Sequence, residues 1–120
     1  MTRPLTDPRI VEVLAAFDVA CKPVPHCRQP NLVDDFMHDA VHSVWGEWGV
    51  DCSRAVLIAH LVHAPEGDLD DILTGARGFL DWRRDFVLQC EYEDAGLGSC
   101  YSDEFEVWRE ERLACQKEAA

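Results

Sequence analysis

The chain has few basic residues and no long apolar run. It contains 11 Lys and Arg against 23 Asp and Glu, a formal charge of -12. This imbalance argues against direct binding to nucleic acid or to an anionic membrane, because the phosphates would be repelled. No segment approaches the roughly 20 apolar residues that span a bilayer, and the N-terminus lacks the apolar run of a signal peptide. We therefore expect a cytoplasmic protein whose partner, if it has one, is a basic protein.

Cysteine pairs with the spacing of a metal site are also missing, since no Cys-x-x-Cys occurs among the six cysteines. Without a secretion signal, six cysteines indicate mostly free thiols and not disulfides. Cys21, His26 and Cys27 could supply three zinc ligands, with Cys100 or Cys115 as a distant fourth. Their spacing matches no standard zinc motif, so we expect no cofactor.

The remaining composition is that of one folded helical domain. Hydrophobic residues make up 48% and charged residues 28% of the 120 residues, which is typical of a globular protein. Two separate domains would each have too little core. Apolar residues recur at helical spacing in five segments. We expect an all-α fold, a single compact domain over residues 1–120 with about five helices around a central apolar helix.

Local signals mark the first two helices. Asp7 followed by Pro8 predicts the start of a helix that runs to about Cys21. Three prolines then predict a surface connector over residues 22–30. A broad apolar stripe over residues 31–48 predicts the second helix.

The third segment, residues 55–64, is apolar nearly all round. This is typical of a segment surrounded by other elements, so we place it at the centre of the core. Because the segment is short and rich in β-branched residues, a buried strand remains an alternative.

The longest predicted helix has Asp68 as its N-cap and keeps one apolar face over six turns. Its glycines, Gly75 and Gly78, predict a kink or a close backbone contact. Ser102 starts the last helix. The apolar face of the long helix comprises Leu69, Ile72, Leu73, Ala76, Phe79, Leu80, Phe86, Val87 and Cys90.

Two histidines of the second helix are weak candidates for metal ligands. His38 and His42 lie one turn apart, with Asp34 and Asp35 a turn before them. Two imidazoles and a carboxylate could hold a divalent ion. Ordinary charge pairs on a solvated helix surface explain the same spacing.

His60 and His63 are a second weak pair, on the most apolar segment, where a core histidine usually bonds to a backbone carbonyl. The string HLVHAPEGDLDDI from His60 to Ile72, with His42 upstream, resembles the motif region of HD-domain phosphohydrolases. The resemblance implies metal bound by His-Asp pairs and hydrolysis of phosphoesters. Ala64 stands where that family has the aspartate after its histidine, so this alternative is a degenerate member.

Trp82 and Arg83 suggest an exposed edge on the long helix. Arg83 falls within the apolar stripe, where an unpaired charge is costly to bury, so it must reach an acid or solvent. Trp82 lies off the stripe and, of the four tryptophans, is the one we expect to be partly exposed. This edge could face a partner or a second copy of the chain.

The densest charge lies between Arg84 and Arg109, an interval without a basic residue. The end of one helix and the start of the next should bring its acids to one end of the molecule. Such a surface could replace nucleic-acid phosphates at a basic cleft, although solvation alone explains it equally well. The predicted partner-binding residues are Glu91, Glu93, Asp94, Asp103, Glu104 and Glu106, together with Trp82 and Arg83.

These observations favour a non-enzymatic acidic inhibitor that occupies a basic site on a partner protein. A site that binds nucleic acid is one form that this basic site could take. Small anti-defence proteins of phages and mobile elements, and toxin-immunity proteins, are of this general kind. A degenerate HD-like phosphohydrolase and a structural or assembly subunit, including a homodimer, are the alternatives.

Overall fold

The computed structural model describes residues 2–27, 29, 31–46 and 50–119, with the backbone alone for residues 118 and 119. These residues form five helical segments and no strand, which confirms the predicted all-α fold. The segments are α1 (Pro8–Ala20), the continuous run α2 (Val33–Phe36), η1 (Met37–His42) and α3 (Ser43–Trp45), then α4 (Arg54–Leu61), α5 (Glu66–Asp94) and α6 (Asp103–Ala119).

Side-chain caps begin the first and last helices where the sequence predicts. The Asp7 carboxylate accepts a hydrogen bond from the backbone N–H of Arg9 at 2.9 Å, and Pro8 occupies the first turn of α1. The Ser102 hydroxyl accepts from the N–H of Phe105 at 3.2 Å and begins α6. Both caps satisfy amides that have no partner within their own helix.

The predicted start of α5 is wrong by three residues. The helix begins at Glu66, after Pro65, and Asp68 lies in its first turn. The Asp68 carboxylate does not cap the helix; it accepts a hydrogen bond from the Trp45 indole N–H at 2.9 Å. A tertiary contact therefore uses the side chain that local sequence reasoning assigned to a cap.

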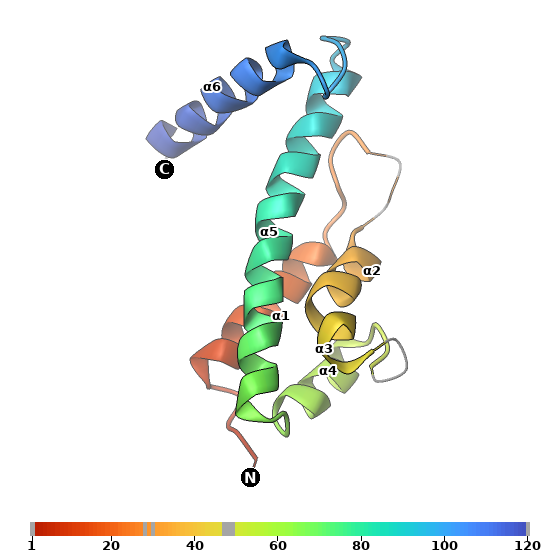
Figure 1. Cartoon of the computed structure of the whole chain (residues 1–120), viewed down its shortest axis with the longest axis vertical. Coiled ribbons are helices and arrows are strands. Elements are labelled where there is room, and N and C mark those ends of the chain that lie inside the picture. Colours follow the sequence, from red (N-terminus) through yellow and green to blue (C-terminus); the bar gives the residue numbers. More distant parts are fainter. Residues whose placement is uncertain (1, 28, 30, 47–49, 120) are drawn as a thin grey trace.

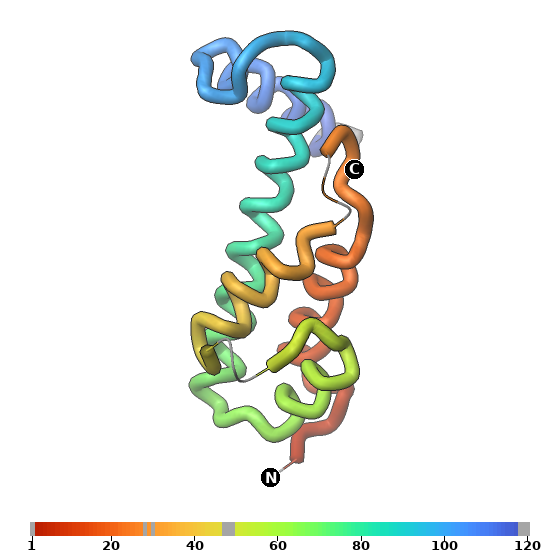
Figure 2. Tube along the Cα trace, turned by 90° about the vertical axis from the view of Figure 1, so that its right-hand side faces the viewer, coloured from red at the N-terminus to blue at the C-terminus, as the bar shows by residue number. Residues whose placement is uncertain are grey.

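The central helix is α5, and not the apolar segment α4. Figures 1 and 2 show α5 running the length of the molecule, with α1 and the α2–α3 run against its first half. Only Leu57 and Leu61 of α4 are buried, because this eight-residue helix packs at one end of the bundle against α1. Several of its other apolar side chains are only partly covered, although the helix is apolar on nearly every side.

The main core forms where α1, the α2–α3 run and the first half of α5 meet. Phe36 is fully buried there and makes edge-to-face contacts with Phe17 at 5.7 Å and with Phe79 at 5.4 Å between ring centroids. The buried face of α5 follows the predicted stripe as far as Phe79. Beyond it, Leu80, Phe86 and Val87 are only partly covered.

The predicted close backbone contact occurs at one of the two helix glycines. A Cβ atom on Gly75 would lie 2.8 Å from the Cα of Ala40 and 2.8 Å from the carbonyl oxygen of Asp39. At Gly78 the same atom would meet no described atom within 4 Å. Gly75 therefore allows α5 to approach η1, the π-helical part of the second segment, more closely than any other residue could.

The second half of α5 and all of α6 form an arm that extends from this bundle (Figure 1). A small second core joins the two helices, with Leu88, Tyr92 and Phe105 buried. The radius of gyration is 16.4 Å, whereas a compact chain of this length would have about 14 Å. The arm accounts for the elongated outline of 52 × 30 × 20 Å.

The described residues contain no helix that is both long enough and apolar enough to cross a membrane. Trp48, which the sequence places on the apolar stripe of the second helix, lies outside the described residues.

Candidate functional site

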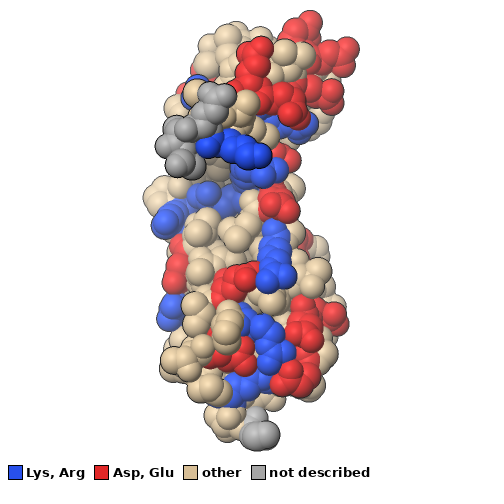
Figure 3. Space-filling view, turned by 90° about the vertical axis from the view of Figure 1, so that its left-hand side faces the viewer, with Lys and Arg blue, Asp and Glu red and all other residues tan. Residues whose placement is uncertain are grey.

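The strongest candidate site is the end of the arm, where α5 stops and α6 begins. Glu93 and Asp94 are the last two residues of α5, and Asp103, Glu104 and Glu106 lie in the first turn of α6. All five are exposed. Figure 3 shows acidic side chains gathered at this end of the molecule. We call these five residues the acidic end.

The turn between the helices is held by hydrogen bonds from the acidic end and its neighbours. The Glu93 carboxylate accepts from the backbone N–H of Cys100 at 3.3 Å. The Ser102 hydroxyl donates to the carbonyl of Ser99 at 2.7 Å while capping α6. Gly96 and Gly98 have positive φ angles of 72° and 133°, which let the chain reverse within this short loop. The acids are therefore mounted on two connected helix ends.

The predicted acids do not all have the same surroundings. Glu91 forms an ion pair with Arg112 of α6, so its charge is used inside the arm. Asp94 pairs with the Nδ1 atom of His26 at 2.8 Å. Among the described side chains, no cation pairs with Asp103, Glu104 or Glu106. Their negative charges suit the N-terminus of α6, whose dipole is positive there.

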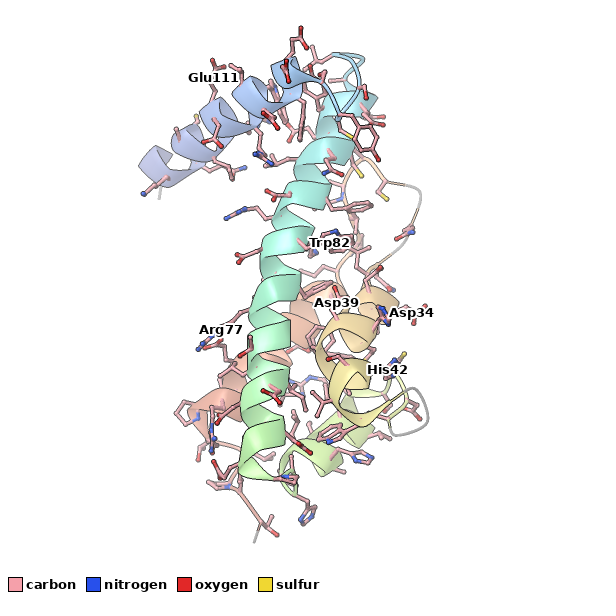
Figure 4. All side chains as sticks on the ribbon, viewed as in Figure 1. Asp34, Asp39, His42, Arg77, Trp82 and Glu111 are labelled. Carbon is pink, nitrogen blue, oxygen red and sulfur yellow. The ribbon has the colours of Figure 1, made fainter. Side chains whose placement is uncertain are left out.

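Most arginines of the bundle are engaged by carboxylates of neighbouring helices. Glu66 accepts hydrogen bonds from Arg9 at 2.6 Å and from Arg3 at 3.0 Å, and these bonds hold the pKa of Glu66 below its ordinary value. Arg54 pairs with Asp18, and Arg77 pairs with Glu12. Arg77 lies on the side of α5 away from the α2–α3 run (Figure 4). The basic groups thus tie helices together, and the excess charge that remains is acidic.

Trp82 and Arg83 lie apart from the acidic end. Eleven residues of helix separate Trp82 from Glu93, which is about 16 Å along the axis. Trp82 is 40% exposed, as the sequence predicts, and stacks on Phe86 at 5.1 Å (Figure 4). The structure therefore divides the predicted partner surface into two regions.

Arg83 lines a separate groove of about 240 Å³ between α5, the end of α1 and the last turns of α6. Its Nε atom is buried and has no hydrogen-bond acceptor among the described residues. Among the described residues, Arg83 pairs with no acid, and it lies apart from the acidic end.

The four histidines proposed as metal ligands line two different hollows. His38 and His42 border one with Asp39, and the Nε2 atom of His42 lies 3.2 Å from the carbonyl of Val50. His60 and His63 border another beside Trp45. Figure 4 shows where His42 and Asp39 lie on the second helical segment.

The expectation that His60 and His63 are core residues is wrong, since both are exposed. They point outward because α4 lies at the edge of the bundle and buries the opposite side of the helix. Within the described part of the chain, no three His, Cys, Asp or Glu side chains come together in a way that could hold a metal ion. The degenerate HD-like alternative gains no supporting geometry.

The cysteines are distributed differently from the proposed zinc set. Burial and the neighbouring Cys27 thiol raise the pKa of Cys90 to about 11. His26 is occupied by Asp94. Burial beside Asp18 raises the pKa of Cys21. All six cysteines are free thiols in the structure.

Two features of the arm escaped the sequence analysis. Arg112 lies over the Trp108 ring at 5.6 Å while it pairs with Glu91, and Tyr92 packs against both Phe105 and Trp108. The spacing of four residues between Trp108 and Arg112 is the signal that could have indicated the first contact. Comparison of the chain with protein-family models, with curated proteins and with solved structures gives no match.

Proposed function

We propose that this protein is a non-enzymatic acidic binder that inserts the acidic end of its arm into a basic site on a partner protein. One observation carries the proposal: Asp103, Glu104 and Glu106 are exposed on a single helix turn and pair with no cation among the described side chains. Carboxylates grouped in this way attract a basic surface, speed association and make it sensitive to salt.

The position of the acidic end supports insertion into a recess. The acids lie at the tip of an arm that projects from the bundle, and the hydrogen bonds of Glu93 and Ser102 brace the turn at this tip. A rigid projecting group loses little entropy on binding. A partner that normally binds nucleic acid is the chemical class that best fits such a group, because its site already favours closely spaced negative charges. An inhibitor of the anti-defence or immunity kind is the corresponding role.

The test compares two variants that change charge equally in different places. In the tip variant, Asp103→Asn, Glu104→Gln and Glu106→Gln remove three charges at the acidic end. In the matched control, Asp39→Asn, Asp71→Asn and Asp81→Asn remove three exposed charges elsewhere. Immobilised wild-type protein and both variants are used to capture proteins from a lysate over a series of salt concentrations.

We expect the wild type and the control to capture the same basic protein, and the tip variant to lose it. Short duplex DNA added in solution should compete for that partner if its site binds nucleic acid. Equal loss with the control would show that net charge alone drives capture, and retention by the tip variant would refute the role of the acidic end. Thermal unfolding of all three proteins checks that each is folded.

A further inference from the structure

The groove beside Arg83 is an apolar surface with basic walls on an otherwise acidic protein. Leu80, Val87 and Leu88 contribute its apolar side, and Arg83 and Arg84 contribute two guanidinium groups. The groove follows α5 from Leu80 to Glu91, which is about 16 Å of helix. A surface of this length and chemistry suits a short ridge of side chains from another helix that carries a carboxylate.

Arg83 indicates what such a helix must bring. A buried N–H donor without an acceptor is rare and destabilising, and the buried Nε atom of Arg83 has none among the described residues. Arg84 has a carboxylate at 3.6 Å, that of its own neighbour Asp85. A carboxylate delivered to this groove would supply the missing acceptor and pair with a guanidinium group at the same time.

The outer face of α6 carries the complementary set. Val107, Glu111 and Ala114 recur at positions i, i+4 and i+7, so they share one face of the helix. Val107 is 60% exposed. Glu111 points away from α5 in Figure 4 and pairs with no cation in the described part of the chain. On this exposed face Val107 and Ala114 flank the carboxylate of Glu111, so the face is mainly acidic.

The arm itself has little support as it stands. Of the described side chains of α6, only that of Phe105 is buried, although the helix has 17 residues. Helices of this length gain most of their stability from packing of an apolar face. Beyond Phe105, α6 is held mainly by the Arg112–Glu91 pair and by the partly buried Trp108 and Leu113.

We propose that two copies of the chain form a dimer in which the outer face of α6 of each copy occupies the Arg83 groove of the other. Glu111 of one copy then accepts hydrogen bonds from Arg83 and Arg84 of its partner, while Val107 covers the apolar side of the groove.

A second copy fits better than a foreign helix because both complementary surfaces are on the same chain. A twofold axis uses the contact twice and leaves neither groove open, which closes the assembly at two copies. The dimer leaves Asp103 and Glu106 in place at the arm end, so it does not depend on the proposed inhibitory function. Failure of either proposal leaves the other standing.

The test uses full-length protein and charge reversal on each side of the contact. Sedimentation equilibrium over a range of protein concentrations should show a monomer–dimer equilibrium for the wild type. Glu111→Arg should weaken dimerisation at least about tenfold, because it places like charges together. The double variant Arg83→Glu with Arg84→Glu should do the same.

An equimolar mixture of the two variants should restore a dimer with one chain of each. In that mixture Arg at position 111 meets the two glutamates of the partner, and the native Glu111 of the partner meets native Arg83 and Arg84. Native mass spectrometry with one chain isotopically labelled distinguishes this heterodimer from either homodimer. Asp71→Arg, an equal charge change on the far side of α5, is the control and should leave the wild-type equilibrium unchanged.

A wild-type protein that remains monomeric at every concentration would overturn the proposal. So would a dimer that survives Glu111→Arg, or a mixture that fails to form the heterodimer when both variants are folded by circular dichroism.

Discussion

Gly75 of α5 lies directly against the backbone of Ala40 in η1. The close approach leaves no room for a side chain, since a Cβ atom on Gly75 would come within 2.8 Å of the Ala40 Cα. Both sides of the contact are backbone, so neither can move aside as a flexible side chain would. The packing of the second helical segment on the central helix therefore depends on this one glycine.

Gly75→Ala should lower the free energy of unfolding by about 1–3 kcal/mol, because the added methyl group forces two helices apart. Gly78→Ala is the matched control, three residues away on the same helix with open space around it. It should raise stability by roughly 0.5–1 kcal/mol through the better helix propensity of alanine. Urea unfolding of both variants measures the difference, and equal effects at the two positions would contradict the contact.

Phe105→Ala should release α6 from α5 without unfolding the bundle. Phe105 is 2% exposed and contacts Tyr92 and Trp108 in a small core that is separate from the main one. Removing a buried ring costs about 3–5 kcal/mol, more than so small a core is expected to supply. Hydrogen exchange should show lost protection in α6 and unchanged protection in α1.

Val107→Ala is the control for that experiment, measured in dilute protein. Its side chain is 60% exposed and lies on the outer face of α6, so the change in stability should be within about 0.5 kcal/mol. A loss of protection throughout the chain in Phe105→Ala would mean that the arm and the bundle unfold together.

The pairing of Glu66 with Arg9 and Arg3 should make stability depend on acid. Because the pKa of Glu66 is lower in the folded protein than its ordinary 4.5, the unfolded chain binds the proton more readily. The pair's full contribution is thus present above about pH 4.5 and is lost as the pH falls through the folded pKa. Unfolding midpoints measured stepwise from neutral pH to pH 3 follow this loss.

Glu66→Gln isolates the effect of this carboxylate from that of the other acids. The variant should be less stable than the wild type at neutral pH, and the gap between them should narrow as the pH falls below 4.5. A gap that stays constant over the whole range would mean that the ion pair contributes nothing that depends on charge.

Local features of the sequence were sufficient for the helix ends that are capped by neighbouring residues. Asp7 with Pro8 and Ser102 each act within three residues of where they stand, so their roles follow from spacing alone. The grouping of the acids at one end follows in the same way, because a short loop joins the two helix ends that carry them.

Roles that depend on distant contacts were not predictable from the sequence. In the sequence, Asp68 looks like an N-cap, but in the structure its carboxylate accepts a hydrogen bond from Trp45. The composition of α4 is that of a core helix, but the much longer α5 is the central helix. In the sequence, Glu91 looks like its acidic neighbours. In the structure its charge is paired with Arg112, which lies 21 residues away.

By itself, the sequence determined the helical class and the acidic charge, because these depend on composition and on spacing within a few turns. Only the tertiary structure decided which helix is central, which acids keep an unpaired charge and which apolar faces stay open. Those outcomes depend on which distant side chains come together, and one-dimensional periodicity cannot distinguish an apolar face that finds a cover from one that does not.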